Sequence, residues 1–455
     1  MRLGLWLLFS TAAGLRAQPP DALTISQAVE SALRNYPSVR VSQEQIAAAA
    51  AGIDLARTYY LPRVDLVAQA NRATRNNVFG LLLPNSVIPS MSGPVIGSNN
   101  FGTAWGSAAG VLVSWEPFDF GLRRAHVAAA GAARNQAQAT LKRTEYDVAV
   151  ATADAYLTLA AAEQTVRAAQ AGVDRAEAVQ KTIQALVKAE LRPGADGSRA
   201  DAEVAAARTQ LIQTQQAVEV ARAVVAQFTG VEPARIALSE SRLNVLPAEQ
   251  APAPINPAAS PIAMEQDAVV ERTKAELRAL ERTYFPRFNL QASAYARGTG
   301  AETNGTLLGG LNGLAPNFQN YAVGFTVNFP AMDLFSMRAR EAAEAAQVRA
   351  ESARYQQIAV DLRAQWNAAI ARLAGARRVA QNTPVQITAS RAAAEQATAR
   401  YRSGLANVDE VAEAQRLLTQ SEIDDALARL GVWRALLEIA AAAGDIQPFL
   451  AEASQ

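Results

Sequence analysis

The sequence predicts a mainly α-helical fold that also carries strands of a transmembrane β-barrel, with the same series of elements built twice. Three observations predict this fold. They are two very long helical hairpins, an internal duplication, and four short segments in which apolar residues alternate with small or polar ones. The expected order in each copy is a helix, two strands and a long helical hairpin.

One long helical hairpin is predicted at 333–443 with its turn at 401–404, and a matching hairpin at 119–227 with its turn at 192–194. Each long arm covers about 71 residues, or about 106 Å at the helical rise of 1.5 Å per residue. Helices of globular domains ordinarily run about 8–20 residues. A pair of hairpins this long therefore indicates a coiled-coil stalk.

A seam of apolar residues, repeated in alternating steps of four and three, runs along each long arm, as in coiled coils. Ten of its twelve positions are apolar in each copy. The first seam consists of Val148, Thr152, Ala155, Leu159, Ala162, Val166, Ala169, Val173, Ala176, Gln180, Ile183 and Val187. The second consists of Leu362, Trp366, Ala369, Leu373, Ala376, Ala380, Thr383, Ile387, Ser390, Ala394, Ala397 and Tyr401. Pro384 lies inside the second seam, and since an interior proline bends a helix, we expect a kink near 382–384.

Identical residues recur in the two halves of the chain at constant intervals. One interval relates the pairs Pro37 and Pro261, Tyr60 and Tyr284, Pro62 and Pro286, and Arg63 and Arg287. A shorter interval relates Asp119 to Asp333 and Gly230 to Gly444. The interval changes only once, between residues 63 and 119, where the first half has a longer loop than the second. Constant intervals on both sides of one such length difference indicate an internal duplication. We expect a first repeat at 18–245, a proline-rich linker at 246–261 and a second repeat at 262–455 that together form one intertwined domain.

The first residues are typical of an export signal peptide. Arg2 provides a short basic start, an apolar run follows at 3–9, and cleavage after Ala17 is expected. A short membrane anchor is the alternative, but the apolar run is far shorter than the ~20 residues that span a bilayer. The signal peptide is therefore predicted at 1–17.

Four strands are predicted at 63–71, 104–115, 288–295 and 321–329, each with apolar residues on one face. This alternation is typical of transmembrane barrel strands. A soluble antiparallel sheet with one wet face is the alternative, but no globular core is predicted to cover it. Because the smallest closed membrane barrels have about eight strands, and an open edge is not tolerated in lipid, the chain must oligomerise.

Charge and residue types exclude several classes of function. The chain has 43 Lys and Arg against 42 Asp and Glu, a formal net charge of +1, which gives no basic bias towards nucleic acid. It has one histidine and no cysteine, which argues against a Cys/His metal site, an iron–sulfur site or a disulfide framework. We therefore expect no catalytic residue, no cofactor and no metal, and the chain is not predicted to be an enzyme.

Four segments carry a resemblance to a known family. They are 23–37 (LTISQAVESALRNYP), 60–63 (YLPR), 115–123 (WEPFDFGLR) and 401–415 (YRSGLANVDEVAEAQ). In this order they resemble the TolC-like outer-membrane efflux proteins, or outer-membrane factors, over essentially the whole mature chain.

The resemblance implies a homotrimer with a 12-stranded barrel in the outer membrane, in contact with lipid, and an α-helical barrel across the periplasm. It implies a passive exit duct of a tripartite efflux or type I secretion system. The expected partners are a periplasmic adaptor (membrane fusion) protein and an inner-membrane transporter of RND or ABC type. An exported coiled-coil scaffold or adhesin without channel activity is the alternative function.

The resemblance also implies a gate of acidic residues just past the last turn. These are Glu410 and Glu413, with Asp409 beside them, and Asp196 holds the corresponding place in the first copy. The spacing of the two glutamates puts both on one helix face. The family's best-known member has Asp at these two positions. Ordinary charges of a solvated helix face are the alternative interpretation.

Tip turns and a latch are expected from the same resemblance. Tyr401 matches a family position that ties neighbouring hairpins shut, and Gly404 forms its turn. The basic partner expected two residues after Gly404 is replaced by Ala406, and Arg402 and Arg192 are the candidates to replace it. In the first copy Arg192, Pro193 and Gly194 stand in place of the simpler glycine turn. The alternative role of Tyr401 is that of the last seam residue.

An aromatic belt at the lipid boundary is predicted from four residues of the strand segments. They are Trp105, Trp115, Tyr321 and Phe329. Aromatic rings gather at both interfaces of membrane barrels. The core of a sheet is the alternative place for the same residues.

Overall fold

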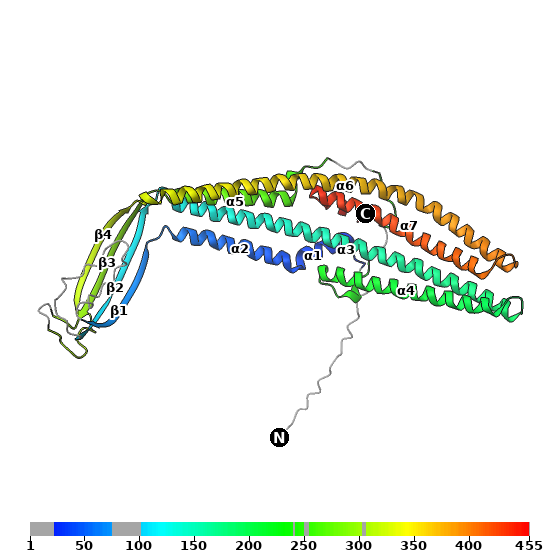
Figure 1. Cartoon of the computed structure of the whole chain (residues 1–455), viewed down its shortest axis with the longest axis horizontal. Coiled ribbons are helices and arrows are strands. Elements are labelled where there is room, and N and C mark those ends of the chain that lie inside the picture. The colour runs from blue at the N-terminus through cyan, green and yellow to red at the C-terminus, as the bar shows by residue number, and fades with distance from the viewer. Residues whose placement is uncertain (1–21, 75–101, 240–241, 250–253, 303–305, 455) are drawn as a thin grey trace, which may run out of the picture. The chain divides into compact units, whose positions relative to one another are not determined.

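A computed structural model describes residues 22–74, 102–239, 242–249, 254–302 and 306–454 of the chain (Figure 1). The predicted signal peptide, most of the segment between the first two strands and part of the proline-rich linker lie outside these residues. The chain divides into two compact units. The helical unit comprises the described residues of Met1–Ser42, Leu141–Met264 and Gln357–Gln455. The sheet unit comprises those of Gln43–Thr140 and Glu265–Gln356.

The predicted order of elements is confirmed in both copies. The first copy contains α1 (Ile25–Asn35), α2 (Pro37–Thr58), β1 (Arg63–Thr74), β2 (Thr103–Phe118), α3 (Leu122–Lys188) and α4 (Gly194–Thr229). The second contains α5 (Pro261–Arg282), β3 (Arg287–Thr299), β4 (Phe318–Asn328), α6 (Leu334–Arg402) and α7 (Val408–Ala443), and α8 (Gln447–Ala453) follows it. Short 3₁₀ helices lie at Pro233–Arg235, Pro257–Ala259 and Ala331–Asp333.

The long arms are α3, of 67 residues, and α6, of 69 residues. None of the 24 predicted seam positions is exposed, and Thr152, Leu159 and Ile183 are completely buried. Helix α6 continues through Pro384, so the proline does not end the helix, and the bend expected there stays a prediction. Among the described helices, none has an apolar stretch long enough to cross a lipid bilayer.

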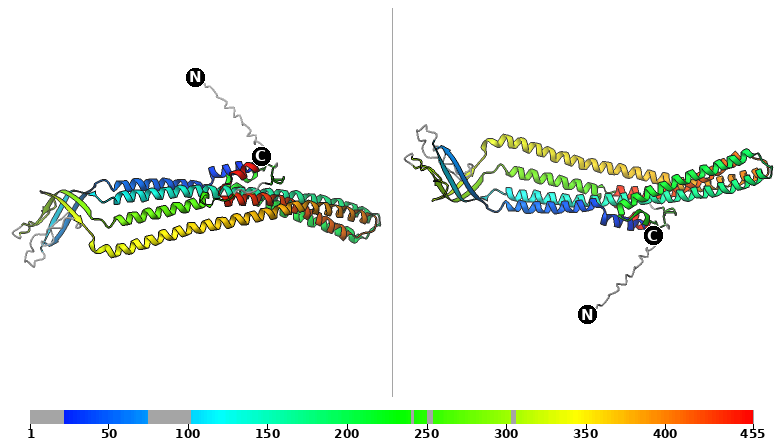
Figure 2. Two further views of the ribbon diagram at one scale, coloured as in Figure 1. Left: turned by 90° about the horizontal axis from the view of Figure 1, so that it is seen from above. Right: turned by 90° about the horizontal axis from the view of Figure 1, so that it is seen from below.

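The helical unit has its largest core where α1, α3, α4, α7 and α8 meet. Trp433 of α7 is completely buried there, packs edge-on against Phe449 at 6.4 Å between ring centroids, and donates its indole N–H to the carbonyl oxygen of Val245 at 3.1 Å. The hydroxyl of the buried Tyr156 donates to the carbonyl oxygen of Leu23 at 2.8 Å. These contacts fix the bases of the two hairpins, which run side by side to their turns (Figure 2).

The sheet unit contains a single antiparallel sheet in the order β1-β2-β3-β4. The register aligns the apolar positions of all four strands: Leu66 lies opposite Val111, Val111 opposite Ala294, and Ala294 opposite Tyr321. Successive side chains of a strand point to opposite faces. One face of the sheet is therefore apolar, and the other carries small and polar residues.

The apolar face of the sheet is strongly exposed in the single chain. Leu66 is 82% exposed and Tyr321 is 86% exposed. Its large members are Val64, Leu66, Val111, Trp115, Leu290, Tyr321, Val323, Phe325 and Val327. Contiguous apolar surface of this kind marks a site of contact with lipid or protein.

Candidate functional site

The two hairpin turns lie next to each other in the helical unit and end their first helices in the same way. The amide of Leu191 donates to the carbonyl oxygen of Leu186, and that of Leu405 donates to the carbonyl oxygen of Arg400, each at 2.9 Å. This six-to-one hydrogen bond needs a left-handed residue just before its donor. That residue is Glu190 in the first turn, with φ 58°, and Gly404 in the second, with φ 77°.

The first turn was predicted at 192–194, and it begins earlier, after the end of α3 at Lys188. Gly194 is the first residue of α4, and Pro193 precedes it as the N-cap. Glu190 takes the strained conformation although it carries a side chain, which ordinarily costs about 1–2 kcal/mol. The sequence gives no local signal for this, because glycine is the residue expected at such a position.

Tyr401 joins the two turns. Its side chain is 2% exposed and packs against Ile183, Val408 and Val411. Its hydroxyl donates to a carboxylate oxygen of Asp196, at the start of α4, at 2.9 Å. Burial, and then the hydrogen bond to Asp196, raise the pKa of Tyr401 to about 12, so the hydroxyl stays protonated and remains a donor. Tyr401 is therefore both the last seam residue and a link between hairpins.

Arg192 supplies the basic contact to Tyr401. Its guanidinium carbon lies 4.4 Å from the centroid of the Tyr401 ring, and it also donates to the carbonyl oxygen of Tyr401. Arg192 stands two residues after Glu190, just as Ala406 stands two residues after Gly404. The basic residue missing from the second turn is therefore present at the equivalent position of the first. Of the two candidates named from the sequence, the structure brings Arg192 to Tyr401.

Three of the four predicted gate acids lie on the first turns of α7, and each has an arginine nearby; the fourth, Asp196, lies in the first turn of α4. Asp409 is 3.2 Å from Arg199, Glu410 is 3.8 Å from Arg400, and Glu413 is 3.5 Å from Arg416, measured between carboxylate oxygen and guanidinium nitrogen. The three arginines belong to three helices, α4, α6 and α7.

The position of these acids at a helix start has a local cause. The Asn407 side chain caps α7 by accepting a hydrogen bond from the Glu410 amide at 2.8 Å. Carboxylates in the first turn also interact favourably with the positive end of the helix dipole. The carboxylates themselves are largely exposed, Glu413 by 77%.

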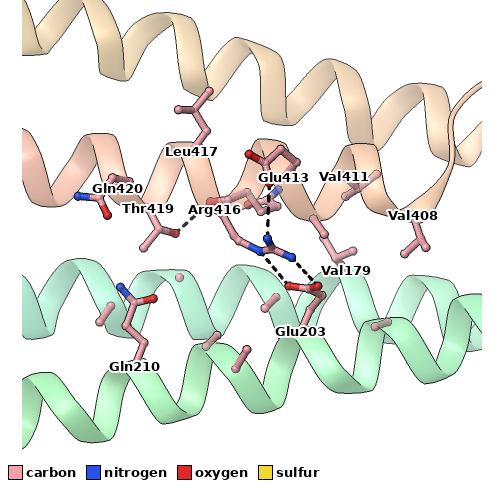
Figure 3. Close-up of a pocket in the computed structure, with 18 of the residues that line it drawn as sticks. Val179, Glu203, Gln210, Val408, Val411, Glu413, Arg416, Leu417, Thr419 and Gln420 are labelled. Atoms are coloured by element: carbon pink, nitrogen blue, oxygen red, sulfur yellow. Dashed lines mark hydrogen bonds and ion pairs between the residues drawn. The ribbon is translucent and has the colours of Figure 1, made fainter.

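Two residues that the sequence analysis missed hold α4 and α7 together. Glu203 accepts hydrogen bonds from the guanidinium of Arg416 at 2.7 and 3.2 Å, and it lies 3.3 Å from Arg199. Figure 3 shows Arg416 between Glu203 and Glu413. The hydrogen bond and the charge of Glu203 raise the pKa of Arg416 above its ordinary value. The only signals in the sequence are the helical spacings of Arg199 to Glu203 and of Glu413 to Arg416.

A cavity of about 440 Å³ lies beside this ion-paired group, between α3, α4 and α7 (Figure 3). Its lining is mostly apolar and small, with Val179, Val408 and Val411 among its members. In the described part of the chain, no group of three acids or histidines is arranged to hold a metal ion.

The predicted aromatic-belt residues all belong to the sheet unit. Tyr321 projects from the exposed apolar face of β4, while Phe329 follows β4 and packs edge-on against Tyr284 at 5.4 Å between ring centroids. The Trp115 indole N–H donates to the carbonyl oxygen of Tyr60 at 3.1 Å, and the guanidinium of Arg72 lies over the ring of Trp105 at 5.5 Å. Their part in a belt stays a prediction.

Comparison with known structures finds the same fold in outer-membrane channels. The outer-membrane channel OprN is 22% identical, with a TM-score of 0.70 over 92% of this chain and 89% of that one. The Campylobacter jejuni CmeC outer membrane channel is 13% identical, with a TM-score of 0.73 over 98% and 94%. The Neisseria gonorrhoeae MtrE outer membrane channel, solved in its open state, is 18% identical, with a TM-score of 0.68 over 93% and 89%.

A sequence search of curated proteins returned no match. The family model described as outer membrane efflux protein matches residues 28–231 and 260–445, which is most of the chain and includes both repeats. The resemblance found in the four sequence segments is thereby confirmed. The chain belongs to the outer membrane efflux protein family, the channels of the bacterial outer membrane that extend into the periplasm.

Proposed function

We propose that this protein is the exit duct of a tripartite efflux or type I secretion system, a passive conduit that opens when a periplasmic adaptor and an inner-membrane pump dock to it. The observation that carries the proposal is the sheet. One of its faces is apolar and exposed, and its outer strands, β1 and β4, have no second neighbouring strand in the described part of the chain.

Three copies would complete this sheet. If β4 of each copy pairs with β1 of the next, three four-stranded sheets close into a barrel of 12 strands. Closure satisfies the unpaired backbone groups of both edges, which lipid does not tolerate. It also turns the apolar face, with Leu66, Val323 and Phe325, towards the acyl chains. A scaffold that is soluble in the periplasm would leave this face in water, which disfavours the alternative function.

The hairpin turns form the periplasmic mouth in this proposal. The hydrogen bond from Tyr401 to Asp196, covered by the guanidinium of Arg192, holds the two hairpins of one protomer together. Opening the mouth requires the hairpins to separate, and docking of the adaptor supplies the free energy for this. Glu410 and Glu413, with Asp409 beside them, line the constriction and attract cations.

The test is the conductance of the purified protein in planar lipid bilayers. The double variant Glu410→Gln/Glu413→Gln should lose cation selectivity and become less sensitive to block by multivalent cations. The matched control is Glu341→Gln/Glu344→Gln, which removes two glutamates at the same spacing from α6 in the sheet unit. Unchanged selectivity and unchanged block in the first double variant contradict the proposed gate.

A further inference from the structure

The acids assigned to the gate are not free charges. Each of Asp409, Glu410 and Glu413 has an arginine within ion-pair distance, and the three arginines belong to three different helices: Arg199 to α4, Arg400 to α6 and Arg416 to α7. The exit-duct proposal gives the acids a role and leaves these arginines without one.

Two of the arginines form one continuous chain of charges with the acids. Starting from Asp409, the chain passes to Arg199 at 3.2 Å, to Glu203 at 3.3 Å, to Arg416 at 2.7 Å and to Glu413 at 3.5 Å. Signs alternate along this chain, and it crosses between α4 and α7. Glu203, which is mostly buried, is its centre and receives a guanidinium from each side.

Alternating charges weaken the field that the acids present to a passing ion. A guanidinium 3–4 Å from a carboxylate cancels most of the carboxylate's potential at any point farther away than the ion pair itself. Salt screens the remaining potential over a distance of about 10 Å. The acids alone would make a strongly cation-selective ring. Together with Glu203 and the three arginines, they carry a net charge of −1 in each protomer, which leaves a ring with a weaker cation selectivity.

We infer that Arg199, Arg400 and Arg416 set the ion selectivity and the cation sensitivity of the periplasmic mouth by neutralising Asp409, Glu410 and Glu413. This inference rests on the proposed function, because it needs the hairpin turns to line a pore. The arginines act on the permeating ion through the acids that they neutralise. Each arginine removed uncovers one negative charge in each protomer.

The experiment compares single substitutions of the three arginines in planar bilayers. Arg199→Gln, Arg400→Gln and Arg416→Gln should each raise the K⁺ over Cl⁻ permeability ratio, read from the reversal potential in a KCl gradient. Each should also lower the half-blocking concentration of Mg²⁺ by about tenfold, the effect of one unit charge about 4 Å from a divalent cation in water that contains salt. Arg378→Gln, on the exposed side of α6 well away from the turn, is the matched control and should match the wild type.

Charge and packing are separated by a conservative variant. Arg416→Lys keeps the positive charge and should recover most of the wild-type selectivity, which a purely structural role of the guanidinium fork does not predict. If Arg416→Gln does not assemble, because Glu203 loses its bidentate partner, Arg199→Gln and Arg400→Gln carry the test, since their side chains are half-exposed or more.

The outcomes distinguish this inference from the function on which it rests. If Glu410→Gln/Glu413→Gln alters selectivity while all three arginine variants match the wild type, the exit duct stands and the inference is overturned. If the wild type does not conduct, or the glutamate variant matches it, the proposed gate itself fails and the inference fails with it.

Discussion

Removal of one hydroxyl group tests the link between the two hairpins. In Tyr401→Phe the ring keeps its packing in the seam and its contact with Arg192, and only the hydrogen bond to Asp196 is lost. A hydrogen bond to a charged group contributes about 1.5–3 kcal/mol. Since Asp196 is partly exposed and water can replace the hydroxyl, the lower end applies. About 1.4 kcal/mol corresponds to a factor of ten in an equilibrium constant.

The closed state of each protomer should therefore become about tenfold less favourable relative to the open state. We expect the mean conductance of Tyr401→Phe channels in planar bilayers to rise above that of the wild type. The control is Tyr355→Phe, which changes a tyrosine of the same helix whose hydroxyl makes no hydrogen bond within the described residues. A normally assembled Tyr401→Phe channel with wild-type conductance refutes the assignment of this hydrogen bond to the closed state.

The same hydroxyl predicts a pH dependence with a defined sign. Burial raises the pKa of Tyr401 in this structure from 10.0 to about 12, and we expect the pKa to return towards 10.0 when the hairpins separate and water reaches the hydroxyl. A raised pKa means that the closed state is fully favoured below pH 10.0 and loses this stability as the pH rises towards 12. Conductance of the wild type should therefore rise between these values. Tyr401→Phe should lack this rise, and an identical pH response of both proteins would show that another group titrates.

Two further predictions concern backbone conformation and the lipid face. Glu190→Gly should stabilise the protein by about 1 kcal/mol, because glycine adopts the left-handed conformation without strain, whereas Gly404→Ala should destabilise it by a similar amount. Thermal unfolding measures both, and equal shifts of the same sign would contradict the assignment. Phe325→Lys on the apolar face should impair outer-membrane assembly, since lysine at mid-bilayer costs about 2–4 kcal/mol. Thr326→Lys on the opposite face should assemble, and extraction of membranes followed by heat-modifiability on gels compares the two variants.

Much of the fold was predictable because its signals are local and periodic. The seam residues recur at helical spacing, and all are shielded in the structure. The strands show a period of two, and the register aligns their apolar positions as the alternation implies. Such patterns persist because a residue that faces the wrong way along a long helix or strand loses its burial. Most strands begin or end a few residues away from their predicted bounds.

The site was predictable only in part. Tyr401, Asp196 and the three gate acids were identified from the family resemblance, but their partners were not, apart from Arg192 as one of two candidates. Glu203, Arg199 and Arg416 sit on helices whose sequences look like ordinary charged surface. Glu190 is the left-handed residue of the first turn, although nothing in its side chain favours a left-handed conformation.

The sequence by itself determined the duplicated order of elements, the two coiled-coil hairpins and the apolar face of the strands, since each follows from the spacing of residues within one element. Only the tertiary structure decided that Arg192 covers Tyr401 and that Arg416 joins Glu203 to Glu413. The first contact joins the turn between α3 and α4 to α6, and the bond from Arg416 to Glu203 joins α7 to α4, each across more than 200 positions of sequence. The physical reason is that an ion pair depends on distances in space, and distances between helices are set by how the seams of both hairpins pack together.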